Sequence, residues 1–137
     1  MIYANIEVIG VINVLNEISK KKLPQKINFA IMKNLLIFQK EYEVYVKSLQ
    51  KLLEQYKDYI LLDENGEQMQ TSNGLPLIQD EVRQEFEKEI SELLSIKIDI
   101  PVYYVSDELF NYDETDGRYD IMTAQELITL QSIICKN

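Results

Sequence analysis

The chain has 137 residues, of which 46% are hydrophobic, and a formal net charge of −9. This size and composition predict one domain, spanning residues 1–137, around one modest core. The sequence contains no histidine, which removes the commonest general base and the commonest transition-metal ligand. The single cysteine, Cys135, has no second thiol with which to form a disulfide or a thiolate metal site. Composition thus argues against an enzyme, and we predict no catalytic residue, metal site or cofactor.

Charge is distributed unevenly along the chain. Residues 1–60 hold 9 lysines and 6 acidic residues, a net charge of +3, whereas residues 61–137 hold 5 basic and 17 acidic residues, a net charge of −12. Phosphate groups repel the acidic half, which argues against direct binding of nucleic acid. The opposite signs of the two halves favour a basic protein partner or a self-complementary homo-oligomer.

The sequence gives no sign of membrane insertion or export. Its longest apolar runs, such as residues 35–38, fall far short of the roughly 20 residues that cross a bilayer. The first residues lack the basic region, apolar stretch and cleavage site of an export signal. We therefore expect a cytoplasmic protein with no membrane contact.

The chain is expected to begin with two consecutive helices. The first is predicted over residues 6–22, where apolar residues recur on one helical face. Its β-branched residues leave a strand over residues 2–9 as the alternative. Pro24 breaks this helix and is tolerated at the start of the next one, which we predict over residues 25–59.

The long helix carries an unusually regular apolar pattern. Its apolar residues alternate at separations of three and four: Leu35, Phe38, Tyr42, Tyr45, Leu49, Leu52, Tyr56 and Tyr59. Such a heptad seam is typical of a helix packed lengthwise against a partner helix. The next helical pattern is a shorter one over residues 80–95, with Asp80 as its N-cap. The two segments predict a long antiparallel helical hairpin.

A small β element is expected on both sides of the second helix of this hairpin. Two turn signals indicate a β-hairpin or an ordered loop over residues 60–79. Alternating apolar residues indicate a strand region over residues 96–105. We find no internal repeat, and the predicted fold class is mainly α, within the α+β group.

The last part of the chain combines an acidic loop with a helix. The loop covers residues 106–120, and the C-terminal helix is predicted over residues 122–135. Thr123 and Glu126 have the spacing of a capping box, in which each side chain accepts a hydrogen bond from the other residue's backbone N–H.

Clustered carboxylates in the acidic loop raise the question of a calcium site. Aligning Gly117 with the glycine that such a loop requires puts Tyr112 at the first ligand position and Thr123 at the last, and neither supplies a carboxylate. Aligning Gly66 fails in the same way. We therefore interpret the segment as a solvated turn, with a nonstandard metal site as the alternative.

The acidic loop is the predicted partner-binding surface. It interleaves carboxylates with two tyrosines: Asp107, Glu108, Tyr112, Asp113, Glu114, Asp116, Tyr119 and Asp120. Carboxylates displayed beside aromatic anchors can imitate a phosphate array to an arginine-rich groove. The alternative interpretation is a face that only improves solubility.

Five short motifs follow one another over most of the chain. They are Leu23-Pro24-Gln25-Lys26, Asp63-Glu64-Asn65-Gly66, Glu92-Leu93-Leu94, Ile98-Asp99-Ile100 and the segment from Thr123 to Leu130. In this order they resemble a family of small uncharacterised proteins from tailed phages and prophages of Gram-positive bacteria. The resemblance implies a phage origin, and with it the cytoplasm of a bacterial host cell, but it carries over no catalytic residue, because the family is a domain of unknown function. The tyrosine-rich seam and the longer acidic loop depart from the family pattern.

These observations favour a function in binding. Our first hypothesis is a phage accessory protein that binds a host or phage protein and inhibits a host defence or nucleic-acid-handling machine by occupying its basic groove. The alternative is a virion-assembly or scaffold protein that self-associates through the heptad helix.

Overall fold

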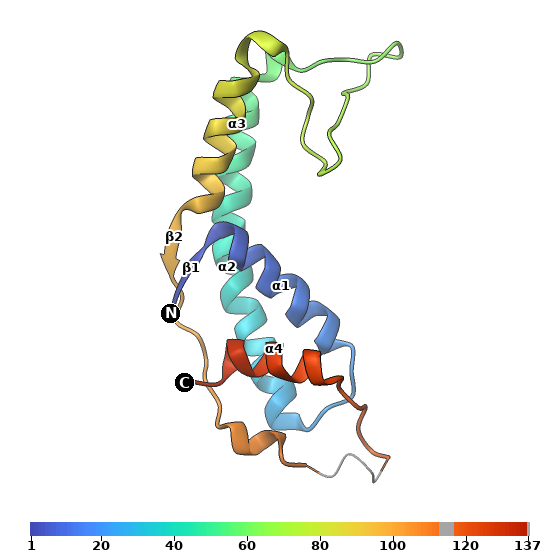
Figure 1. Ribbon diagram of the computed structural model, residues 1–137, viewed down its shortest axis with the longest axis vertical. Coiled ribbons are helices and arrows are strands. Elements are labelled where there is room, and N and C mark those ends of the chain that lie inside the picture. Colours follow the sequence, from blue (N-terminus) through green and yellow to red (C-terminus); the bar gives the residue numbers. More distant parts are fainter. Residues whose placement is uncertain (113–116, 137) are drawn as a thin grey trace. The chain divides into compact units, whose positions relative to one another are not determined.

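The computed structural model of the protein describes residues 1–112 and 117–136 (Figure 1). In chain order, its elements are β1 (Ile2–Ala4), α1 (Asn5–Ser19), α2 (Gln25–Gln55), the short 3₁₀ helix η1 (Lys57–Tyr59), α3 (Asp80–Ser95), β2 (Lys97–Asp99), the 3₁₀ helix η2 (Asp107–Phe110) and α4 (Ala124–Ile134). The predicted fold class is confirmed, with a long helical hairpin, a small β element and a C-terminal helix.

The chain forms two compact units. Unit 1 comprises Met1–Glu43 and Lys97–Asn137, and unit 2 comprises Val44–Ile96. Each unit has its own cluster of buried apolar residues. The expectation of one core is therefore wrong. Helix α2 is continuous and supplies residues to both clusters. Its heptad seam keeps a regular spacing, so the sequence does not reveal that the seam packs against different helices in the two units.

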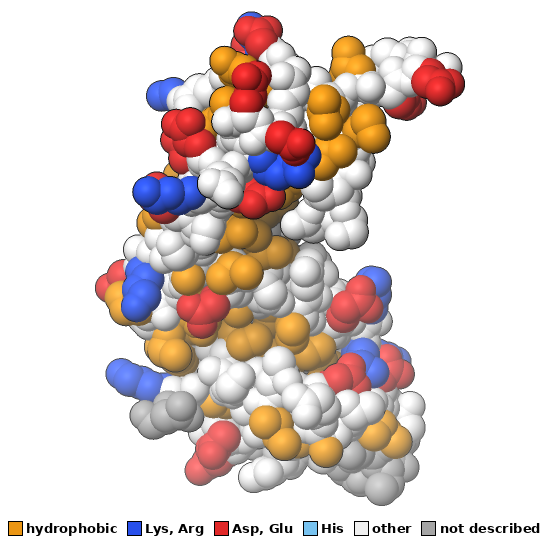
Figure 2. Space-filling model, turned by 45° about the horizontal axis from the view of Figure 1, so that its top comes forward, with side chains coloured by type: hydrophobic (Ala, Val, Ile, Leu, Met, Phe, Trp, Pro, Cys, Tyr) orange, Lys and Arg blue, Asp and Glu red, His pale blue; other side chains and the backbone are white. Residues whose placement is uncertain are grey.

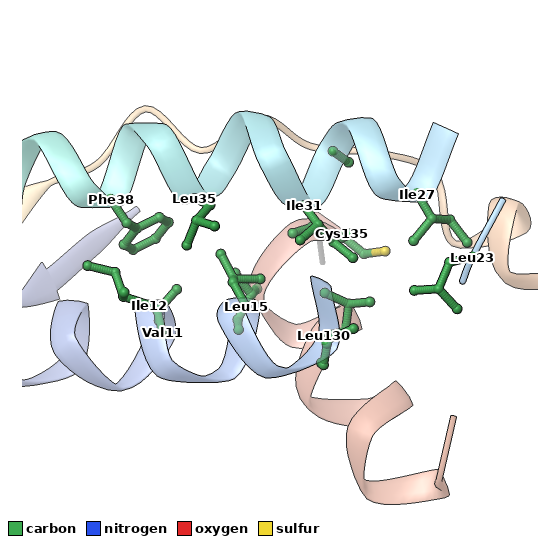
Figure 3. Packing of buried hydrophobic residues seen from close by; sticks show 14 of the residues in the cluster. Val11, Ile12, Leu15, Leu23, Ile27, Ile31, Leu35, Phe38, Leu130 and Cys135 are labelled. Atoms are coloured by element: carbon green, nitrogen blue, oxygen red, sulfur yellow. The ribbon is translucent and has the colours of Figure 1, made fainter. Parts of the chain in front are cut away.

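The core of unit 1 is formed by α1, α2 and α4. Figure 3 shows Ile27, Ile31, Leu35 and Phe38 of α2 turned towards α1 and α4. Three of these four side chains are fully buried. The antiparallel pairing of β1 with β2 brings Tyr3 into the same core, where its ring meets that of Phe38 edge-on at 5.1 Å between centroids.

Helix α1 differs from its prediction at both ends. The chain starts as β1 and becomes helical at Asn5, where the Glu7 carboxylate accepts a hydrogen bond of 2.9 Å from the Ala4 N–H. The helix ends at Ser19, before Lys22. The Lys22 N–H donates to Asp120 Oδ2 at 2.7 Å and not to a helix carbonyl. The helix thus closes with local bonds of the Lys20 and Lys21 N–H groups, and Lys22, beyond its end, contacts a residue far away in the sequence.

The predicted strand region pairs as a strand only over β2, and the residues that follow are held by Asn34. This side chain is completely buried in α2. Its Oδ1 accepts a hydrogen bond from the Tyr103 N–H, and its Nδ2 donates to the Tyr103 carbonyl oxygen, both at 2.8 Å. One amide thereby satisfies both backbone groups of Tyr103, which has no strand partner. Further along, Val105 N–H donates to the Ile134 carbonyl at 2.8 Å.

Helix α4 spans Ala124–Ile134 and is shorter than predicted. Thr123 is its N-cap, and Cys135 has left the helix to form an isolated bridge with Val105. The capping box is confirmed: Thr123 Oγ1 accepts from the Glu126 N–H at 3.1 Å, and Glu126 Oε1 accepts from the Thr123 N–H at 2.9 Å.

Unit 2 contains the hairpin of α3 with the C-terminal part of α2, seen side by side in Figure 1. Helix α3 has the predicted bounds, although its N-cap is Gln79 and Asp80 lies in the first turn. The Tyr56 hydroxyl donates a 2.6 Å hydrogen bond to Glu89, and its ring meets that of Phe86 at 5.1 Å. The second half of the seam is therefore satisfied by α3, as predicted.

Residues 60–79 form an arm of two successive turns. Helix α2 ends at Gln55 and not at the predicted residue 59, because the chain passes through η1 into this arm. Gly66 and Gly74 occupy equivalent places, with φ of +78° and +81°. The two segments LLDENGEQ and MQTSNGLP begin at residues 61 and 69 and share the Asn-Gly turn. An eight-residue repeat that we had not expected thus produces this arm.

Replacing Asn34 tests its role in joining residues 100–105 to α2. The Asn34→Ala variant leaves the partly buried Tyr103 N–H and carbonyl without their partner, so we expect the free energy of unfolding to fall by about 1–3 kcal/mol. Urea unfolding followed by circular dichroism measures it. The matched control is Asn13→Ala, at an exposed position of α1, which should change stability by less than about 0.5 kcal/mol. Equal effects of the two substitutions would contradict this role.

The hydrogen bond between Tyr56 and Glu89 predicts a pH dependence of stability. This bond, with burial, raises the pKa of Tyr56 from 10.0 to about 12. A raised folded-state pKa contributes stability that is complete below the unfolded value and is lost as pH rises towards the folded value. We expect stability to decline between pH 10 and 12 more steeply in the native protein than in Tyr56→Phe. Alkaline titration of phenolate absorbance should show one late-titrating tyrosine that the variant lacks.

Candidate partner-binding surface

The described part of the acidic segment begins on a short helix that is anchored at both ends. At its start, Ser106 Oγ accepts a hydrogen bond from the Glu108 N–H at 3.3 Å. At its end, Phe110 is buried in the core of unit 1. Asp107 and Glu108 lie between these anchors and are exposed. The fold thus presents two neighbouring carboxylates to solvent on a fixed backbone.

A hollow of about 510 Å³ lies beside Asp107. Its wall is formed by residues 105–107 together with residues of α4 and the chain beyond it, including Gln131 and Lys136. Ile128, which also lines the hollow, is 62% exposed. A carboxylate, an exposed apolar side chain and a recess are thus brought together within unit 1.

The two tyrosines of the predicted site lie against one another. The rings of Tyr112 and Tyr119 meet edge-on at 5.4 Å between centroids, and the guanidinium of Arg118 lies 5.4 Å from the centre of the Tyr119 ring. Both tyrosines are half-buried, and Tyr112 packs against the core of unit 1. The ring pair therefore brings the chain on the two sides of residues 113–116 together, which leaves less of each ring for a partner.

Asp120 has a structural role. Its Oδ2 accepts a hydrogen bond from the Lys22 N–H at 2.7 Å, and its own N–H donates to the Lys22 carbonyl at 2.8 Å. Nearby, Lys21 Nζ lies 3.5 Å from the Glu126 carboxylate. The backbone N–H of Thr123 is the main cause that lowers the pKa of Glu126. These contacts fasten the end of the acidic segment to the turn between α1 and α2.

The structure therefore divides the predicted site residues into three groups. Asp107 and Glu108 are exposed, and Asp107 lines the hollow. Tyr112, Tyr119 and Asp120 take part in contacts within the chain. Asp113, Glu114 and Asp116 lie outside the described residues.

Two observations on the described residues concern metal ligands and the thiol of Cys135. Residues 1–112 and 117–136 bring together no group of three or more carboxylate, thiol or imidazole side chains that could hold a metal ion. Cys135 is 9% exposed, and burial raises the pKa of its thiol, with a further contribution from the charge of Asp107. A buried thiol of raised pKa is a poor nucleophile.

The heptad seam is largely used within the chain. Leu35 and Phe38 are buried in unit 1, and Leu52 and Tyr56 are buried in unit 2. Tyr42 is the more exposed middle residue, at 37%. Self-association through the seam stays a prediction, but most of its side chains already have partners.

On the face drawn in Figure 2, acidic side chains stand singly or in small groups between basic and apolar ones. This dispersal means that recognition would depend on a local set of carboxylates such as Asp107 and Glu108. Among the helices of the described residues, none is both long and apolar enough to cross a membrane.

No protein-family model, curated protein or solved structure matches the chain. Support for a function comes from the chemistry of the chain itself.

Two features of that chemistry were not foreseen from the sequence. Asn34 was missed because the sequence analysis considered only the apolar residues of this helix. The signal was its position, since Asn34 is a polar residue between the apolar residues Ile31 and Leu35. The exposed apolar residues of α2 were also passed over, because the seam accounted for the pattern of that helix.

The different roles of Asp120 and Glu108 can be separated by their effect on stability. Asp120→Ala removes the acceptor of the Lys22 N–H, so we expect the free energy of unfolding to fall by about 1 kcal/mol. Glu108→Ala changes an exposed side chain and should lie within about 0.5 kcal/mol of the native protein. Thermal and urea unfolding of the two variants measure both values. A Glu108 variant that is as destabilised as the Asp120 variant would show that the whole segment is structural.

Proposed function

We propose that this chain is a phage-derived, non-enzymatic accessory protein that binds a protein partner through its acidic segment. The partner is a host or phage protein with a basic nucleic-acid groove, and binding inhibits a host defence or nucleic-acid-handling machine. The observation that carries the proposal is the pair Asp107 and Glu108, which are exposed on an anchored backbone, with Asp107 at the edge of a hollow of about 510 Å³.

The chemistry of this surface favours a basic partner. A guanidinium group that meets an exposed carboxylate forms charge-assisted hydrogen bonds, which are stronger than neutral ones. The anchors at Ser106 and Phe110 hold the carboxylates in place before binding. Less conformational entropy is then lost in the complex. The exposed Ile128 supplies apolar area next to the charges.

The wider charge of the chain supports the same assignment. Residues 61–137 carry a net charge of −12, which attracts a basic protein over a distance and raises its association rate. The resemblance of the five motifs to proteins of tailed phages supports the phage origin. The support for a phage origin lies in the order of the five motifs along the chain and not in any single motif.

Charge reversal tests the proposed surface. The test variant carries lysine at Asp107, Glu108, Asp113, Glu114 and Asp116, and leaves Asp120 intact because of its structural role. The control variant carries lysine at five exposed acidic positions of unit 2: Asp58, Glu64, Glu67, Glu81 and Glu92. Both variants change the net charge equally. Proteins captured from a Gram-positive lysate by the native chain are identified by mass spectrometry, and the affinity of each purified partner is then measured.

We expect the test variant to bind the partner at least about tenfold more weakly than the control does, with a smaller dependence on salt. Double-stranded DNA should compete with the native chain for the partner. Equal weakening in both variants would show that only the overall charge matters. Unchanged binding by the test variant, or binding that DNA does not affect, would refute imitation of nucleic acid.

A further inference from the structure

Helix α2 exposes a strip of large apolar side chains on the part that belongs to unit 1. Phe29, Met32 and Leu36 are 57%, 49% and 64% exposed. Their separations of three and four residues place them next to one another on one side of the helix. Figure 3 shows the core residues of α2 on the side that faces α1 and α4, and the helical repeat puts the strip on the opposite side. We call it the outer strip.

This arrangement is unusual for a helix at the surface of a protein. A surface helix normally has one apolar face towards the core and a polar face towards solvent. Here the residues most distant from the core are also apolar. The ring of Tyr103 lies edge-on to that of Phe29 at 5.7 Å between centroids and is itself 39% exposed. Because Asn34 holds Tyr103 in place, the strip has a fixed neighbour that widens it.

Lysines line one edge of the outer strip. Lys26, Lys33 and Lys40 are exposed and recur at every seventh residue, so that they form a row parallel to the helix axis. Within the described ranges 1–112 and 117–136, none of the three forms an ion pair. The opposite edge carries the amides of Asn28 and Gln39, which are neutral.

These charges argue against a second copy of the chain as the occupant. Two copies that pair antiparallel about the middle of the strip bring the same edge of both helices together, so the lysine row of one copy meets the lysine row of the other. Parallel pairing places each lysine row against neutral amides. Like charges facing one another are destabilising, and Glu43, which lies on the same side of α2, stands beyond Lys40 at the end of the strip and not opposite the lysine row.

We propose that the outer strip binds an acidic amphipathic helix of another protein. Apolar side chains of the partner, three and four residues apart, lie against Phe29, Met32 and Leu36, and its carboxylates lie opposite the lysine row. This is the groove-and-helix type of recognition, in which apolar anchors give affinity and flanking charges select the partner. The site is separate from the acidic segment and does not depend on the function proposed for that segment.

Two helical peptides of about 14 residues, roughly 20 Å long, test this site. Both carry the same leucine stripe, but one is flanked by glutamates and the other by lysines. Fluorescence anisotropy of labelled peptide measures binding to the native chain. Besides the native chain, the experiment uses a triple variant that carries Lys26→Glu, Lys33→Glu and Lys40→Glu. We expect the native chain to prefer the acidic peptide by at least about tenfold, and the triple variant to prefer the basic peptide.

The apolar part of the strip is tested with Leu36→Ser, whose matched control is Ile6→Ser at a similarly exposed isoleucine of α1. We expect Leu36→Ser to weaken binding of the acidic peptide about tenfold or more, and Ile6→Ser to leave it unchanged. Circular dichroism confirms that each variant is folded. A native chain without preference between the peptides, or equal effects of the two serine variants, would overturn the proposal.

Other occupants give distinct results. A photocrosslinker at Met32 in bacterial lysate should capture acidic helical segments, identified by mass spectrometry of the crosslinked peptides. Light scattering that shows a dimer of the native chain but a monomer of Leu36→Ser would assign the strip to a second copy. Binding to vesicles with anionic lipid that Leu36→Ser abolishes would assign it to a membrane surface. Either result would overturn the proposal.

Discussion

A single buried amide determines where the second half of unit 1 lies. Residues 100–105 have no continuous strand partner, yet their backbone must be satisfied where it is buried against α2. Asn34 does this with two 2.8 Å hydrogen bonds to Tyr103, from a fully buried side chain that also donates to the Ala30 carbonyl at 2.9 Å. The chain that follows, including η2 and the exposed carboxylates, is held by further contacts, such as those of Val105 with Ile134 and of Asp120 with Lys22. A hydrocarbon side chain at residue 34 would fill the space but leave the position of the segment unspecified.

The second constraint is the continuity of α2. Its 31 residues contain neither glycine nor proline, so nothing in the backbone interrupts the helix where one compact unit gives way to the other. The seam keeps its spacing throughout, although α1 and α4 cover it in unit 1 and α3 covers it in unit 2. Because α2 is one continuous helix, each unit builds its own core on it without a linker between the two parts of the helix.

Features that depend on local chemistry could be predicted from the sequence. The bounds of α3 and the capping box of Thr123 and Glu126 follow from residues within one or two turns. Features that depend on distant contacts could not. Lys22, beyond the end of α1, bonds to Asp120, and Asn34 contacts a residue 69 positions away. The two turns of the arm were predicted. The eight-residue repeat was missed because its two segments have few residues in common.

The same distinction applies to the binding surfaces. The acidity of residues 106–120 is visible in the sequence, but the attachment of Asp120 to Lys22 and the pairing of Tyr112 with Tyr119 are not. The outer strip was not predicted because α2 is apolar on two sides, and the heptad seam alone was enough to explain the apolar pattern of the helix.

The two surfaces differ physically. Binding at Asp107 and Glu108 rests mainly on charge and should weaken as salt screens it, whereas binding at Leu36 also buries apolar area, which salt does not screen. The lysines of the strip would then determine which helix binds, and its apolar residues how tightly.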